Sequence, residues 1–347
     1  MSILANYSTR LFLFCFLLAG IPTIWPSQAR AEWYKDEQAI MGTVVRVELW
    51  AEDPDKAQKA IQAVMDEMRH IDDTMSPYKP ESELSRINQK AADEKLVISK
   101  ELFGLIRTSL KFSELTHGAF DITFASVGRF YDFRKHLRPN AEEIKANLPK
   151  ISYRHVILDD AHKTIHFSME GVYIDLGGIA KGYAVDRSIA LLQSMGIKHA
   201  IVTAGGDSRI IGDRMGRPWM VGIRDPRKSG AVSGVIPLTD SALSTSGDYE
   251  RYFIEDGKHY HHILNPGTGD SARELRSVSV LGPDATTTDA LSTSIFVLGL
   301  AKGMALVETL PDIETIIIDQ AGKMHYSSGL LSTPERSSDT AKNINNN

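Results

Sequence analysis

GPDATTTDALSTSIFVLG, residues 282–299, has the apolar spacing of an amphipathic helix but carries six hydroxyl side chains in its first turns. Hydroxyl residues are poor helix formers because they compete for the backbone's hydrogen bonds. A requirement other than helix propensity therefore selected them. They surround a single internal carboxylate, Asp289, and are Thr286, Thr287, Thr288, Ser292, Thr293 and Ser294.

Asp289 and Thr293 are four residues apart, so a helix places them on one face, one turn apart, with Ser292 beside them. A carboxylate with hydroxyl groups is a set of hard oxygen donors that suits Mg²⁺ or Ca²⁺. Two or three oxygens are too few for Mg²⁺, so backbone carbonyls, waters and substrate phosphates would have to complete the site. The spacing alone favours a plainer alternative, a helix start with several residues able to cap it.

The rest of the chain predicts one α+β unit. The first part alternates a strand with amphipathic helices, and from residue 151 the chain is rich in short strands typical of a largely antiparallel sheet. We expect helices over residues 53–75, 98–118, 180–195 and 301–310, an exposed helical excursion near 134–149, and strands over 41–50, 155–160, 164–169, 172–178, 199–212, 219–226, 234–247, 251–266, 278–284 and 313–320.

The two ends of the chain are expected to lie outside this unit. Arg10 precedes an apolar run too short to span a membrane confidently, and Ala31 closes a small-x-small cleavage pattern, so residues 1–31 are interpreted as a signal peptide. The only cysteine, Cys15, lies inside the run, where it cannot serve as a lipidation site. We therefore expect a periplasmic protein without a lipid anchor, with a domain over 32–331 and a disordered polar tail over 332–347.

Composition excludes several classes of function. With 39 Lys and Arg against 44 Asp and Glu, the net charge of -5 offers no polybasic surface for nucleic acid and at most peripheral contact with a membrane. Without a cysteine beyond the leader, a thiol nucleophile and a Cys-ligated metal are excluded. A small molecule or another protein is the expected partner.

A second candidate site is YIDLGGIAKGYAVDR, residues 173–187, which reads as a strand, a Gly-Gly turn and a helix start. Glycines let the backbone approach a ligand closely, and Lys181 at a helix N-terminus could meet a phosphate or another anion. The stretch is neither a Walker A sequence nor a G-x-G-x-x-G motif, so a plain strand-to-helix connection remains the alternative.

Other residues give weaker signals. Asp121 stands between aromatic and β-branched neighbours, where a carboxylate needs a partner. Tyr78, in a proline-flanked loop, could stack on a planar ring or fill a surface groove. His261 and His262 face opposite ways if the strand is extended, so at most one of them points into a given site.

Taken in order, eight blocks of the sequence resemble the successive motifs of the ApbE family of flavin transferases. The resemblance runs from Met41 to the late IIID strand and implies an α+β, T-fold-like single catalytic unit with mixed and antiparallel sheets and packed helices. The blocks are MGT, SPYKPESELSRIN, GAFDIT, IDLGGIAKGYAVD, TAGGD, TSGDYERYF, HHILNPGTG and TTDALSTSIFVLG.

The resemblance implies a Mg²⁺-dependent FAD:protein FMN transferase. Such an enzyme moves FMN from FAD onto a Thr or Ser hydroxyl of a target flavoprotein through a phosphoester bond and releases AMP. The acceptor would carry a Ser/Thr-Gly-Ala-Thr motif and belong to a respiratory electron-transport complex. Two alternatives stay open: a FAD pyrophosphatase that makes FMN and AMP, and an exported flavin-binding or storage protein without turnover.

The resemblance also assigns roles to individual residues. Tyr78 stands where several members have Trp, and Ser292 where some have Asp, which could weaken Mg²⁺ binding. The implied metal ligands are Asp289, Ser292, Thr293 and the carbonyl of Gly178; the implied flavin-binding positions are Met41, Tyr78, Ala119, Phe120, Asp121, Asp175, Lys181 and the backbone near Leu264. For catalysis we expect His262 to be the general base, because imidazole titrates near neutrality, with Asp289 sharing the work.

Overall fold

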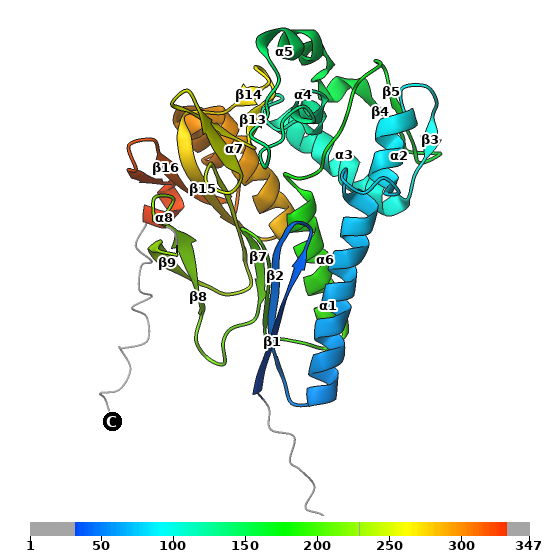
Figure 1. The fold of residues 1–347 in the computed structure, drawn as a ribbon. Coiled ribbons are helices and arrows are strands. Elements are labelled where there is room, and N and C mark those ends of the chain that lie inside the picture. Colours follow the sequence, from blue (N-terminus) through cyan, green and yellow to red (C-terminus); the bar gives the residue numbers. More distant parts are fainter. Residues whose placement is uncertain (1–31, 229, 332–347) are drawn as a thin grey trace, which may run out of the picture.

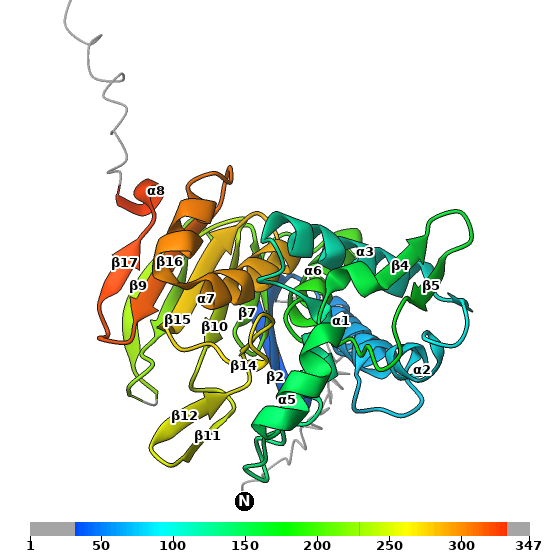
Figure 2. The same cartoon turned by 90° about the horizontal axis from the view of Figure 1, so that it is seen from above.

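The computed structural model describes residues 32–228 and 230–331. The predicted signal peptide and the predicted disordered tail lie outside these residues. The described chain combines an antiparallel sheet with packed helices, which confirms the α+β fold (Figures 1 and 2).

An eight-stranded sheet forms the centre of the fold, and every neighbouring pair in it is antiparallel. Along β2, every second residue is buried, as the alternating sequence predicts. In spatial order the strands are β1 (Glu32–Ile40), β2 (Thr43–Ala51), β6 (Ala200–Ala204), β7 (Asp207–Ile211), β10 (Ala242–Gly247), β15 (Leu275–Gly282), β16 (Glu314–Asp319) and β17 (Met324–Tyr326).

Three helices cover one face of this sheet, side by side (Figures 1 and 2). Helix α1 (Pro54–Met75) contacts β1 and β2, and its first turn is capped by Asp53. Helix α6 (Ala180–Ser194) contacts β6 and β7, and α7 (Ala285–Val307) contacts β10, β15 and β16. On the opposite face, the hairpin of β8 (Trp219–Arg224) and β9 (Val232–Leu238) covers a separate hydrophobic cluster.

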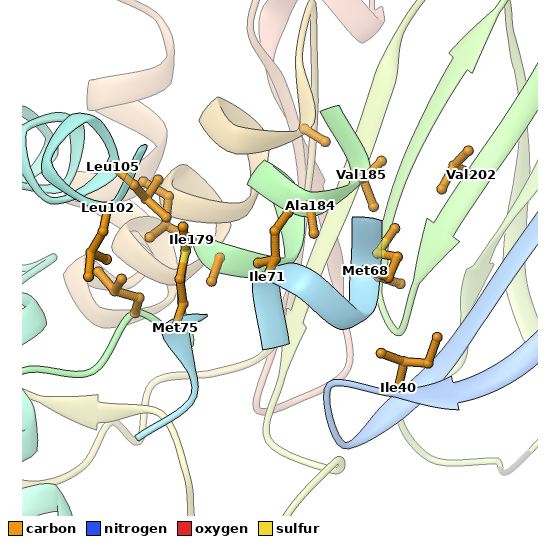
Figure 3. Packing of buried hydrophobic residues seen from close by; sticks show 14 of the residues in the cluster. Ile40, Met68, Ile71, Met75, Leu102, Leu105, Ile179, Ala184, Val185 and Val202 are labelled. Atoms are coloured by element: carbon orange, nitrogen blue, oxygen red, sulfur yellow. The ribbon is translucent and has the colours of Figure 1, made fainter. Parts of the chain in front are cut away.

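Helix α3 (Lys100–Leu115) contacts α7 and extends the core away from the sheet. Figure 3 shows Leu102 and Leu105 of α3 beside Met75 of α1 and Ile179, the residue that precedes α6. The buried residues that form this chain of contacts include Ile40, Met68, Ile71, Met75, Leu102, Leu105, Ile179, Ala184, Val185 and Val202.

Smaller elements complete the fold. They are α2 (Glu83–Lys90), β3 (Leu96–Val97), η1 (Ile122–Phe124), α4 (Ala125–Gly128), α5 (Ala141–Asn147), η2 (Leu148–Lys150), η3 (Tyr153–His155), β4 (Val156–Asp159), β5 (Thr164–Phe167), β11 (Tyr252–Glu255), β12 (Lys258–His261), β13 (Leu264–Asn265), β14 (Asp270–Ser271) and α8 (Ser328–Leu331). Figure 2 shows α5 and the β11–β12 hairpin projecting on the same side of the molecule.

Helix α7 is broken at Gly299, where φ is 80° and ψ is 178°. The break lies between the two helices that the sequence predicts, so their separation is confirmed. By length and composition α7 could cross a membrane, but half of its most apolar stretch is buried inside the protein. It is therefore a core helix of this fold.

The strand predicted over residues 172–178 is wrong. These residues belong to no strand, and at Ile174 the backbone pairs with a side chain: Asn88 donates to the Ile174 carbonyl at 2.9 Å and accepts from the Ile174 amide at 2.8 Å. The Asp175 amide donates to the Ile122 carbonyl at 2.9 Å. Apolar alternation cannot distinguish these partners from a sheet.

Close packing of α6 on α7 depends on Gly182. A Cβ at this position would lie 2.1 Å from the Ala285 carbonyl oxygen and 2.7 Å from the Asp289 Cβ. Both are parts of α7 that cannot move without shifting the helix. The absence of a side chain thus brings the first turns of the two helices together.

We expect Gly182→Ala to destabilise the protein by about 1–3 kcal/mol, because the added methyl group overpacks the contact between the two helices. Gly104→Ala in α3 is the matched control. A Cβ there meets nothing within 4 Å, so better helix propensity should stabilise that variant by up to about 1 kcal/mol. Urea unfolding measures both effects, and equal stability of the two variants would contradict the close approach.

Candidate functional site

The N-terminal turns of α6 and α7 are joined by the carboxylate of Asp186 on α6. Its oxygens accept from the backbone amides of Ala285, at 2.9 Å, and Thr286, at 2.8 Å. Asp284 is the N-cap residue of α7, and its side chain accepts from the Thr287 amide at 2.8 Å. First-turn amides without helical partners are thus satisfied partly by a neighbouring helix, which fixes the position of one helix start against the other.

Most of the hydroxyl groups on α7 have structural roles. The Thr288 hydroxyl lies 2.8 Å from that of Ser244 on β10, and Ser294 donates to a carbonyl of its own helix at 2.6 Å. Thr286 and Thr287 bond the two capping carboxylates. For Thr286 and Thr287 the plainer alternative, a well-capped helix start, is correct, and Thr288 and Ser294 make other structural hydrogen bonds.

Ser292 and Thr293 share one partner, the hydroxyl of Ser246, at 2.8 Å and 3.2 Å. Ser292 is fully buried and also donates to the Asp289 carbonyl at 2.9 Å, so its hydroxyl is occupied by the protein. Thr293 is only partly buried. Of the two hydroxyls, Thr293 is better placed to meet a ligand.

Asp289 is a buried carboxylate with cationic and amide partners. One oxygen accepts from the Gly182 amide at 2.9 Å, and the Lys181 ammonium lies 3.4 Å from both oxygens. Lys181 also forms an ion pair with Asp207 at 2.7 Å. The structure therefore brings together the metal ligand and the lysine that the resemblance implies.

The charges in this group perturb one another. Burial and the neighbouring Asp207 carboxylate raise the pKa of Asp289 to about 7, against the opposing effect of Lys181. Burial disfavours the charge of Lys181, but the two carboxylates outweigh it and raise the pKa of the ammonium above its ordinary value. Because two carboxylates share one ammonium, binding of a further cation next to Asp289 is electrostatically favourable.

Gly178 lies against Thr293. A Cβ on Gly178 would be 3.4 Å from the Thr293 hydroxyl and 3.2 Å from the ring of Phe120. The following residue, Ile179, is fully buried and anchors the turn. Phe120 is itself buried, so it supports this turn, whereas stacking on a ligand would require an exposed ring.

The two central histidines, His261 and His262, differ in their hydrogen-bond partners. His261 is buried, with Nε2 2.5 Å from the Ala272 carbonyl. His262 has a buried Nδ1 that no described residue contacts as a hydrogen-bond partner. Burial, followed by the charge of Arg251 and smaller contributions that include Lys181, lowers the pKa of His262 to about 3. His262 therefore lies in the charged site as a neutral imidazole.

The flavin positions divide into exposed and internal residues. The Tyr78 side chain is 79% exposed, so its ring is available for stacking. Desolvation of its hydroxyl, followed by the negative charge of nearby Asp175, raises the pKa of Tyr78, and the positive charge of Arg251 opposes this effect. The Asp175 carboxylate accepts a hydrogen bond from the Gly177 amide at 2.6 Å, so Asp175 lies beside the Gly178 turn.

Asp121 and Leu264 face the protein interior. The Asp121 oxygens accept from the amide and hydroxyl of Thr123 and from the Tyr153 amide, at 2.6–2.9 Å, so its need for partners is met internally. The Leu264 side chain is buried in a cluster with Val127 and Tyr131, leaving only its backbone for a ligand.

Met41 and Ala119 are partly buried, and Met41 occupies the turn between β1 and β2 with a φ of 56°. An open depression of about 480 Å³ lies beside this turn, lined also by Thr43 and Asp72. The start of β2, just after this turn, is bonded to the β6–β7 turn, where the Gly205 amide donates to the Val44 carbonyl at 3.0 Å. Met41 thus lies at the sheet end from which Asp207 begins β7.

Asp207 and Arg251 belong to the site but received no individual role from the sequence. Asp207 stands in TAGGD and Arg251 in TSGDYERYF, two of the blocks that carry the resemblance. A single buried carboxylate at a strand start gives no spacing signal. Their order among the other motifs was the only signal that could have found them.

The donor set fits a hard divalent cation better than a soft one. In the described ranges, no group of three or more His, Cys, Asp and Glu side chains is arranged to hold a metal. Asp289, the Thr293 hydroxyl and the nearby Gly178 backbone offer oxygen atoms only. The Lys181 ammonium, equidistant from the Asp289 oxygens, shows that this carboxylate already accommodates a cation.

The chain matches the profile of the ApbE family over residues 41–317. Among curated proteins, the FAD:protein FMN transferase of Treponema pallidum is 30% identical over 323 residues, covering 88% of this chain and 89% of that protein. The enzyme of the same name from Vibrio cholerae is 32% identical over 298 residues, covering 83% and 89%.

Solved structures agree with these relatives. The crystal structure of an ApbE protein from Thermotoga maritima has a TM-score of 0.81 and 36% identity, covering 86% of this chain and 98% of that one. The flavin transferase ApbE from Vibrio cholerae has a TM-score of 0.78 and 30% identity, covering 87% and 99%. With the family profile matched over most of its length, the chain belongs to the ApbE family.

Proposed function

We propose that this protein is a Mg²⁺-dependent FAD:protein FMN transferase that attaches FMN to a Thr or Ser hydroxyl of a target flavoprotein and releases AMP. The observation that supports it most is the arrangement around Asp289, where a buried carboxylate meets the Gly182 amide and the Lys181 ammonium. The curated relatives bear this enzyme's name, and they align with most of the chain.

Asp289, Thr293 and the Gly178 carbonyl are the residues that would hold Mg²⁺, with substrate and water oxygens completing its coordination. The bound cation would neutralise charge on the pyrophosphate of FAD during phosphoryl transfer. Ser292 supports this group from behind, because its hydroxyl is held by Ser246 and the Asp289 carbonyl.

His262 is the residue to which we assign the acceptor's proton. Its pKa of about 3 keeps the imidazole neutral throughout the physiological pH range, but it also makes the ring a weaker base than the imidazole titrating near neutrality that the sequence led us to expect. Its buried Nδ1 has no hydrogen-bond partner among the described residues, so this nitrogen is available to a ligand hydroxyl. Tyr78 supplies the exposed ring on the flavin side of the site.

The location and the acceptor extend this proposal. The leader over residues 1–31 supports export to the periplasm without lipidation. An acceptor on that side of the membrane would be a respiratory electron-transport subunit with a Ser/Thr-Gly-Ala-Thr motif. Such a partner requires protein recognition and no nucleic acid, which agrees with the net charge of -5.

The direct test incubates the protein from residue 32 onward with FAD, Mg²⁺ and a flavoprotein domain that carries this motif. A denaturing gel should show flavin fluorescence on the acceptor, and EDTA included in the reaction should prevent this labelling. Release of FMN and AMP without a fluorescent acceptor, also with acceptors of varied motif, would replace the proposal with a pyrophosphatase. Retained FAD without any turnover would indicate a binding or storage protein.

Asp289→Asn should lower flavinylation at least about a hundredfold, because the variant keeps the shape of the side chain but loses the charge that holds the cation. The fold should survive, since the Asn oxygen can still accept from the Gly182 amide. Gel fluorescence measures the activity, and thermal unfolding measures the fold. Activity close to that of the wild type in a folded variant would contradict the metal assignment.

His262→Ala should lower kcat/KM by about 10²–10⁴, the usual contribution of a positioned base. At saturating Mg²⁺, His262 should produce no loss of activity between pH 7 and pH 5, because a group with a pKa of about 3 stays deprotonated over this range. A pH–rate profile tests this. An acid limb near pH 6.5 that disappears in the variant would indicate an ordinary, accessible imidazole.

A further inference from the structure

Lys181 lies between two buried carboxylates at unequal distances. Its ammonium is 2.7 Å from Asp207 and 3.4 Å from Asp289. Both aspartates are 2% exposed, so water does little to screen either interaction. The shorter contact is with the residue outside the proposed metal-binding set.

This inequality matters for cation binding. Asp289 is the only carboxylate among the proposed ligands of Mg²⁺, and an ammonium in close contact with it would compete for its oxygens. Lys181 is long and flexible enough to choose between the two carboxylates. The short contact with Asp207 keeps the Lys181 ammonium closer to Asp207 than to Asp289.

The backbone that carries Asp207 is fixed on both sides. Asp207 is the first residue of β7 and pairs with Ala204 on β6 and Ser244 on β10. At the preceding residue, Gly206, a Cβ would lie 2.6 Å from the Thr245 carbonyl oxygen, so two backbones meet closely there. A residue held by two neighbouring strands can set the position of a lysine at the start of a helix.

We propose that Asp207 is a positioning residue: its closer contact with Lys181 limits the ion pair between the ammonium and Asp289 to the longer distance of 3.4 Å, and so leaves the Asp289 carboxylate available to a divalent cation. This inference rests on the proposed function, in which Asp289 is a metal ligand. The competing explanation is that Asp207 only neutralises a buried lysine, in which case its loss would lower stability without changing cation affinity.

The test measures Mn²⁺ binding to the protein without flavin, by electron paramagnetic resonance of the free ion, together with thermal unfolding. Asp207→Asn keeps the shape of the side chain and removes its charge. We expect the Mn²⁺ dissociation constant to rise about tenfold or more, as for other partners that orient a metal ligand. An unchanged dissociation constant with a lowered melting temperature would overturn the proposal.

Asp240→Asn is the matched charge control. Asp240 accepts from the Gly212 amide just beyond the opposite end of β7, and Asn tolerates its φ of 47°. The five-residue strand separates the two ends by roughly 15 Å. The Mn²⁺ dissociation constant of this variant should lie within about twofold of the wild-type value, because salt screens the effect of a charge at this distance. A loss equal to that of Asp207→Asn would reduce the effect to net charge.

Two further readouts separate positioning from folding. A crystal structure of Asp207→Asn should show the Lys181 ammonium closer to the Asp289 oxygens than the present 3.4 Å, and an unchanged separation would overturn the proposal. The double variant Asp207→Asn with Lys181→Gln leaves no unpaired lysine and should fold even where the single variant does not. It should recover most of the lost Mn²⁺ affinity, and failure to do so would count against competition by Lys181.

Asp289→Asn distinguishes failure of this inference from failure of the proposed function. If Asp289→Asn weakens Mn²⁺ binding and Asp207→Asn does not, only the positioning role is wrong. If wild-type binding is insensitive to Asp289→Asn, the proposed metal site is wrong, and the positioning role falls with it.

Discussion

The site depends on the contact between the first turns of α6 and α7. Asp186 satisfies two amides of α7 from α6, and Gly182 removes the side chain that would keep the two helices apart. Only in this arrangement does the Gly182 amide reach Asp289 at 2.9 Å. The backbone of one helix therefore helps to hold the carboxylate of the other, and the positions of Lys181 and Thr293 follow from the same contact.

Sequence periodicity predicted the elements with strong patterns and missed those without. The helices α1, α3 and α6, and the break at Gly299, were predictable because their apolar spacing and glycine have direct backbone consequences. Strand β1 was missed because its nine residues include four charged ones, as suits an edge strand. The segment around Ile174 was misassigned because its hydrogen-bond partner is the side chain of Asn88, which no local pattern reveals.

The site was predictable to the extent that motif order constrains it. Lys181 and Asp289, to which the resemblance assigns flavin and metal binding, lie in contact in the fold, and Gly178 lies against Thr293. The single sequence could not show which hydroxyls were structural, because capping and ligand binding select the same residue types. Charge balance was also hidden: Asp207 is 82 residues before Asp289 in the chain, and only the folded sheet brings both to one ammonium.

The separation of these groups along the chain has a consequence for folding. Lys181 contacts a residue 108 positions later, and the turn at Gly178 precedes Thr293 by an even longer interval that contains β6, β7, β10 and β15 of the central sheet. Such non-local contacts require closure of long loops, whose entropy cost slows folding. The cation that we propose for this site would need both halves of the site, so it would bind the native state and stabilise it over the unfolded chain.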